Sequence, residues 1–189
     1  MAKNLITKAE YKAYKGINST TQDASIDSII PKVSAFIKNI CKRSFIDYVD
    51  EPKIEVFKGG QFLLPSETPV LQILSLECSF DYGNTYTELV EYTDFVLDAE
   101  EEHIVPIGLT EFPNMVNGYK VSYLAGYENL PEDLKIATMD LVEYYLRNDG
   151  AVHSPKAPGT NSVQIEYIST TNLPAHIKRV LDLYMSHYG

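Results

Sequence analysis

The chain lacks tryptophan, has only two cysteines and contains no long apolar run. No stretch approaches the roughly 20 apolar residues that a membrane-spanning helix needs, and the opening MAKNLITKAEY lacks the apolar centre of a signal peptide. We therefore expect a protein that is made in a cytoplasm and has no membrane partner. Cys41 and Cys78 belong to no closely spaced pair that binds zinc or exchanges electrons, so we expect both to be reduced and buried.

Basic residues are also scarce. Sixteen Lys and Arg stand against twenty-six Asp and Glu, which gives a net charge of −10. Nucleic-acid readers neutralise phosphates with Lys and Arg, so this balance disfavours that class. An acidic surface suits a wall past which DNA slides without adhering, although most acidic proteins are acidic simply for solubility. The charge alone leaves both interpretations open.

Motifs that carry catalysis are missing as well. No Gly-x-Ser-x-Gly elbow occurs, and Gly59-Gly60 is not followed by the Gly-Lys-Ser/Thr of a phosphate-binding loop. In the acidic run from Asp98 to His103, neighbours on extended chain point to opposite sides, so the run predicts a solvated turn and no metal site. None of the four histidines has metal-ligand spacing, and we interpret all as surface residues: His103, His153, His176 and His187. We expect no enzyme, cofactor or metal; a hydrolase built on the acidic run is a remaining hypothesis that no motif favours.

Helical periodicity marks both ends of the chain. Thr7 and Glu10 have the spacing of a capping box, and Gly16 closes a first short helix. A longer apolar face follows over residues 26–41, where Pro31 predicts a kink or a late start near Asp27. Towards the other end, one helix opens at Pro131 and stops at 148–150. The last helix opens at Pro174.

The period changes to that of strands between residues 46 and 118. Residues 53–57 and 61–64 predict a hairpin around Gly59-Gly60. Residues 70–80 predict a longer strand, and 81–84 a turn into a partner at 86–90. Shorter strands are expected at 95–97, 103–105 and 119–124. The middle of the chain is thus expected to form a small, mostly antiparallel β unit.

The predicted fold class is α+β, a helical bundle core of about four helices with this β unit inserted. The expected organisation is one domain over 1–189, with N-terminal helices in 1–45, the β unit in 46–127, and C-terminal helices in 128–150 and 173–189. A long loop, 151–172, would join the last two helices, with a possible strand at 163–168. Such long loops are usually functional or mobile.

Fourteen tyrosines are the unusual feature of the composition. Four fall on the two C-terminal helices, where they either pack one helix on the other or form a protein interface. Both roles are compatible, and the amount of apolar surface favours oligomerisation.

Several ordered motifs resemble one known family. Val121-Ser122-Tyr123-Leu124-Ala125-Gly126-Tyr127 is followed by Leu130-Pro131-Glu132-Asp133-Leu134 and a Tyr-rich helix. Further pieces in matching order are Ile40 to Phe45, Phe62-Leu63-Leu64-Pro65, Thr68-Pro69-Val70, Ser162 to Tyr167, and Leu173-Pro174 to Tyr188. Together they resemble the head-tail connector (adaptor, or head completion) proteins of tailed bacteriophages.

This resemblance implies a structural protein of the virion neck, made in the cytoplasm of a bacterial host. It implies a ring, typically of twelve copies, that joins the portal protein to a stopper, tail completion or nozzle protein while DNA passes through the lumen. Such a ring needs a heterologous interface between copies. The alternative is a small non-enzymatic binding module, monomeric or dimeric, that uses the same helices as a closed core.

On this interpretation two surfaces are candidates for contact. The final helix is the candidate for the portal contact, through Ile177, Val180, Leu181, Tyr184 and Tyr188. The loop 151–172 or the β unit is the candidate for tail-side or subunit contacts, and the residues named for them are Val163, Ile165, Tyr167, Tyr144 and Tyr145.

Overall fold

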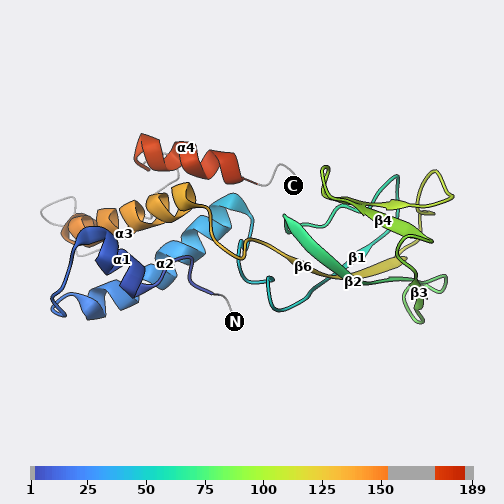
Figure 1. Ribbon diagram of the computed structural model, residues 1–189, viewed down its shortest axis with the longest axis horizontal. Coiled ribbons are helices and arrows are strands. Elements are labelled where there is room, and N and C mark those ends of the chain that lie inside the picture. The colour runs from blue at the N-terminus through green and yellow to red at the C-terminus, as the bar shows by residue number, and fades with distance from the viewer. Residues whose placement is uncertain (1–2, 153–172, 186–189) are drawn as a thin grey trace, which may run out of the picture. The chain divides into compact units, whose positions relative to one another are not determined.

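The computed structural model describes residues 3–152 and 173–185, with side chains up to Arg147 and again from Leu173. Residues 43–129 form one compact unit, and the described residues before and after them form a second. We call them the β unit and the helical unit (Figure 1). Within the described residues, four helices and antiparallel sheets confirm the predicted α+β class.

The helical unit contains α1 (Lys8–Lys15), α2 (Asp23–Cys41), α3 (Glu132–Val152) and α4 (Ala175–Tyr184). The predicted capping box is confirmed: Thr7 and Glu10 satisfy each other's backbone N–H groups, and Gly16 ends α1 with a φ of 67°. These contacts satisfy donors and acceptors that a short helix would otherwise leave open.

Two helices extend further than predicted. Helix α2 begins at Asp23, so the late start expected near Asp27 is wrong. The helix continues through Pro31, and the alternative of a kink at this proline stays a prediction. The helix continues because buried residues on both sides of the proline, such as Ile26 and Val33, hold it to the core. Helix α3 reaches Val152, beyond the stop expected at 148–150. A single glycine inside a helix costs only about 1 kcal/mol, which does not force an end.

The core of the helical unit lies where α2, α3 and α4 meet. Its fully or nearly fully buried residues are Tyr11, Ile26, Ile30, Val33, Ile37, Cys41, Leu134, Ala137, Leu141, Val142, Ile177 and Leu181. Cys41 and Cys78 are both reduced and buried, as predicted. No helix in the described residues is long and apolar enough to cross a bilayer.

The β unit is built on a four-stranded antiparallel sheet. Its strands are β1 (Lys53–Phe57), β6 (Tyr119–Ala125), β2 (Val70–Cys78) and β3 (Thr87–Leu89), in that order across the sheet. Strands β4 (Phe95–Asp98) and β5 (His103–Pro106) pair separately. The predicted strands at 70–80, 86–90, 95–97, 103–105 and 119–124 are confirmed with small shifts in their ends.

The predicted hairpin around Gly59-Gly60 is wrong. Strand β1 pairs with β6, from Lys53 opposite Tyr123 to Phe57 opposite Tyr119, while Gly60 bridges to Phe112. The glycines serve a different purpose here: a Cβ on Gly59 would overlap the backbone oxygens of residues 112 and 113. They permit a close backbone approach and do not make a two-residue turn.

One face of the sheet forms the core of the β unit. Alternate residues of β6, from Tyr119 to Ala125, are buried, and so are Ile73, Leu76 and Cys78 of β2. Phe95, Ile104, Phe112 and Leu63 complete the core. The opposite face leaves large side chains of β1 in solvent, with Ile54 63% and Val56 51% exposed.

A polar network ties β1 to the core face of β6. The Tyr123 hydroxyl donates to Glu55 Oε2 at 2.7 Å and accepts from the Glu67 N–H at 3.2 Å. Lys53 Nζ lies 3.1 Å from Glu55 Oε1. Burial raises the pKa of Glu55, but hydrogen bonds from Ser66, Tyr123 and Lys53 lower it by more, so the pKa lies below its ordinary value of 4.5.

Replacing Glu55 with glutamine should lower the free energy of unfolding at neutral pH by about 1–3 kcal/mol, because charge-assisted hydrogen bonds are lost. Folding depresses this pKa, so the ionised carboxylate stabilises the fold above pH 4.5 and its contribution disappears as the pH falls through the depressed value. The gap between wild type and variant, measured by urea unfolding, should therefore shrink in acid. Glu100→Gln, at an exposed position, is the control; a gap for Glu55→Gln that does not change with pH would contradict the assignment.

Candidate interaction surfaces

Helix α4 presents two different faces. Ile177 and Leu181, predicted as portal contacts, are each 1% exposed and pack inside the helical unit. Val180 and Tyr184 are half-buried, and the Tyr184 hydroxyl donates to Asp133 Oδ1 at 2.6 Å. The residues that α4 offers to solvent are Ala175, His176, Lys178, Arg179, Asp182 and Leu183, of which Leu183 is 75% exposed. The fifth predicted portal residue, Tyr188, lies outside the described residues.

The tyrosine pair of α3 is half-buried. The rings of Tyr144 and Tyr145 meet edge to face with centroids 6.0 Å apart, and Phe36 of α2 packs 6.5 Å from Tyr145 in the same manner. Burial raises the pKa of Tyr145. The structure therefore gives these rings a packing role within the helical unit. The predicted contacts Val163, Ile165 and Tyr167 lie outside the described residues.

Negative charge is concentrated in the β unit. It holds sixteen acids and four bases, a net charge of −12, whereas the rest of the chain holds ten acids and twelve bases. No Lys or Arg occurs between residues 59 and 119. The acids in that stretch are Glu67, Glu77, Asp81, Glu88, Glu91, Asp94, Asp98, Glu100, Glu101, Glu102 and Glu111. The β unit is therefore the acidic part of the protein.

Among the described residues, no group of three or more His, Cys, Asp or Glu side chains could hold an ion. The run from Asp98 to His103 contains the turn 99–102 between β4 and β5, where Asp98 Oδ1 accepts from the backbone N–H of Glu100 at 3.0 Å. The predicted solvated turn is confirmed. His103 itself stacks on Phe62 with ring centroids 4.6 Å apart.

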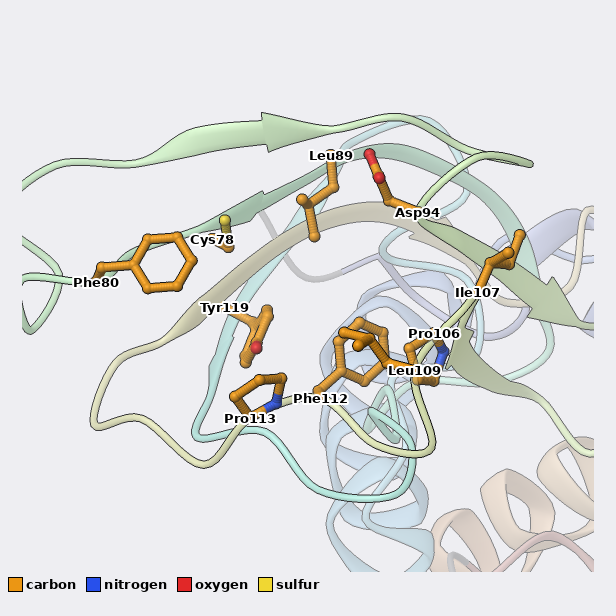
Figure 2. Close-up of a pocket in the computed structure, with 10 residues that line it drawn as sticks. All are labelled: Cys78, Phe80, Leu89, Asp94, Pro106, Ile107, Leu109, Phe112, Pro113 and Tyr119. Carbon is orange, nitrogen blue, oxygen red and sulfur yellow. The ribbon is translucent and has the colours of Figure 1, made fainter.

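An apolar pocket of about 150 Å³ opens in the β unit (Figure 2). Its walls come from β2, β3, β6 and the chain that follows β5; the lining residues are Cys78, Phe80, Leu89, Asp94, Pro106, Ile107, Leu109, Phe112, Pro113 and Tyr119. Asp94 is the only charged residue of the lining, and its Oδ2 accepts from the Val90 N–H at 2.7 Å. The lining is mostly apolar, so the pocket is suited to an apolar side chain.

Most of the exposed apolar residues of the β unit cannot be found from the sequence pattern. The pattern predicts Ile54 and Val56 inside a hairpin and Phe80 at the end of a strand, yet Phe80 is 78% exposed. The different net charges of the two units can be found by counting residues along the sequence. The exposed apolar residues cannot be found in this way, because strand alternation does not reveal which face of the sheet is covered.

The helices and antiparallel sheets of the described residues define an α+β protein. The sequence profile of the family described as "Head completion protein" matches residues 4–186. The chain therefore belongs to the head completion protein family, which confirms the resemblance seen in its motifs.

Solved structures share the fold over nearly the whole chain. A chain in "Neck of empty GTA particle computed with C6 symmetry" has a TM-score of 0.63 and 16% identity, over 96% of this chain and 90% of that one. A chain in "Neck of native GTA particle computed with C12 symmetry" has a TM-score of 0.58 and 16% identity, over 98% and 95%. A chain in "Virion of native gene transfer agent (GTA) particle" has a TM-score of 0.61 and 14% identity, over 96% and 90%. No protein of curated function matches the sequence.

Proposed function

We propose that this chain is a non-enzymatic structural protein of the neck of a tailed phage or phage-like particle. The observation that carries the proposal is membership of the head completion family over residues 4–186. Fold similarity to chains from particle necks along 96–98% of the sequence supports it. Among the described residues, no group of three or more His, Cys, Asp or Glu side chains could hold a metal ion.

Within the neck, the chain forms a ring of about twelve copies. The C12 symmetry named for one structural neighbour supports this number. A cyclic ring requires each copy to present two different, complementary surfaces. Apolar side chains that are exposed on the β unit and on α4 could form such surfaces.

The ring joins the portal protein to a tail-side partner. In this proposal the solvent-facing side of α4, with Arg179 and Leu183, contacts the portal, and the buried Ile177 and Leu181 hold α4 in place for that contact. The β unit serves the tail-side or subunit contacts. Its net charge of −12 suits a surface that DNA passes without adhering.

A monomeric or dimeric binding module is the second candidate, favoured by the closed apolar core of the helical unit. Light scattering after size exclusion separates the two. We expect a discrete species of about twelve times the 21.3 kDa chain, either alone or on addition of the portal protein. A 21.3 kDa monomer under both conditions would refute the ring and favour the binding module.

A further inference from the structure

The four-stranded sheet of the β unit ends in two open edges. Its order is β1-β6-β2-β3, so β1 and β3 each pair on one side only. Unpaired strand edges carry free N–H and C=O groups that readily pair with another chain. The five residues of β1 and the three of β3 are thus candidates for pairing between chains.

The directions of the two edge strands are compatible with a ring of copies related by rotational symmetry. Three successive antiparallel pairings separate β1 from β3, so the two edge strands run in opposite directions. Rotation about an axis nearly parallel to the strands keeps the direction of β1 unchanged in the next copy. Placed beside β3, that next β1 is antiparallel to it, and the outer face of one sheet continues into the outer face of the next.

On the outer face, each edge of the sheet carries a charged side chain that has no ion-pair partner among the described residues. One row across the sheet runs from Val56 through Lys120 and Glu77 to Glu88. Lys120 forms an ion pair with Glu77. Glu88 therefore faces a carboxylate that is already paired, and no base in the described part of the chain forms an ion pair with it.

The other edge carries the opposite charge. Lys58 follows β1, is exposed, and has no carboxylate partner among the described residues. The alternation of exposure along β1 puts it on the same face as Ile54 and Val56. A cation with two apolar neighbours thus stands at one edge and an unpaired anion at the other, which is the charge complementarity of a head-to-tail contact.

We propose that β1 of one copy pairs antiparallel with β3 of the next copy, which places Val56 and Lys58 beside Glu88 of the neighbour. The occupant of each edge is a second copy of this chain. The inference rests on the proposed ring and names the surface that closes it. Cross-strand pairs of this kind stabilise sheets, and twelve such joins would make one continuous sheet around the ring.

Cysteines placed at both edges test the contact directly. Val56 and Glu88 of one chain lie three strands apart, about 14 Å, so a disulfide between them within the chain is excluded. In the full-length variant Val56→Cys/Glu88→Cys, oxidation of assembled rings should give a ladder of linked chains on a non-reducing gel. Ile54→Cys/Glu88→Cys tests a register shifted by two residues, and each single variant should give no ladder.

Other outcomes overturn the proposal. A dimer from Val56→Cys alone would indicate that two β1 edges pair with each other. If the rings are intact by light scattering but neither double variant gives a ladder, the edge contact is refuted and the proposed ring is not. Wild-type protein that stays monomeric with the portal would overturn both the ring and this contact.

A charge exchange gives a second, independent readout. Lys58→Glu and Glu88→Lys should each raise the concentration needed for half-assembly by a factor of about 2–5 at low salt, as expected for a surface ion pair. The double variant should return within about twofold of wild type, because the pair is restored with reversed sign. Two single variants without effect, or a double variant as defective as the sum of the singles, would contradict the pairing.

Discussion

Replacing Leu181 with alanine should lower the free energy of unfolding of the isolated chain by about 2–5 kcal/mol, the usual cost of a cavity in a well-packed core. Leu181 is 1% exposed and sits among the buried residues of the helical unit. Its backbone oxygen also accepts from Cys41 Sγ of α2 at 3.7 Å, so α4 is tied to that helix. Urea unfolding followed by the helical circular dichroism signal measures the change.

Leu183→Ala is the matched control, since Leu183 lies two residues away on α4 and is 75% exposed. We expect it to change stability by less than about 0.5 kcal/mol and to weaken binding of the portal protein. If Leu181→Ala left the isolated chain as stable as wild type and only weakened portal binding, the buried position of Leu181 would be contradicted. The pair thus separates a residue that holds α4 from one that makes contact.

Replacing Gly126 with alanine should destabilise the β unit by about 2–5 kcal/mol, from the combined cost of a positive φ angle and of overlap. Gly126 ends β6 with a φ of 111°, and a Cβ there would overlap the Phe45 carbonyl. That same carbonyl accepts from the Tyr127 N–H at 2.7 Å, so it cannot move away freely. Unfolding followed by tyrosine fluorescence measures the loss.

Gly108→Ala is the comparison variant. Gly108 has a φ of 75°, and a Cβ at this position would have no atom within 4 Å, so only a backbone cost of about 1–2 kcal/mol remains. The difference between the two variants reports the overlap with Phe45 together with the higher backbone cost of a φ of 111°. Equal effects at both glycines would show that Phe45 does not constrain this turn.

The helices and most strands could be predicted from sequence because their signals are local. Thr7 and Glu10 define the start of α1, Pro131 precedes α3, and alternation along β6 marks its buried face. The partner of β1 could not be predicted in this way. Strand β6 lies more than sixty residues further along the chain, and only packing in three dimensions selects it over the nearer segment at 61–64.

The candidate surfaces follow the same division. A stripe of apolar residues on α4 is visible in the sequence, but one stripe can serve either an internal core or a partner. Burial assigns Ile177 and Leu181 to the core and leaves Leu183, which stands outside the stripe, in solvent. At the sheet edges, Lys58 and Glu88 become a candidate pair only once the order of the strands is known.

The most direct test of the neck assignment is electron cryo-microscopy of particles assembled with and without this chain. We predict a ring of about twelve copies between portal and tail that is present only when the chain is supplied, with DNA density along its axis in filled particles. An unchanged neck in particles that lack the chain would contradict the account.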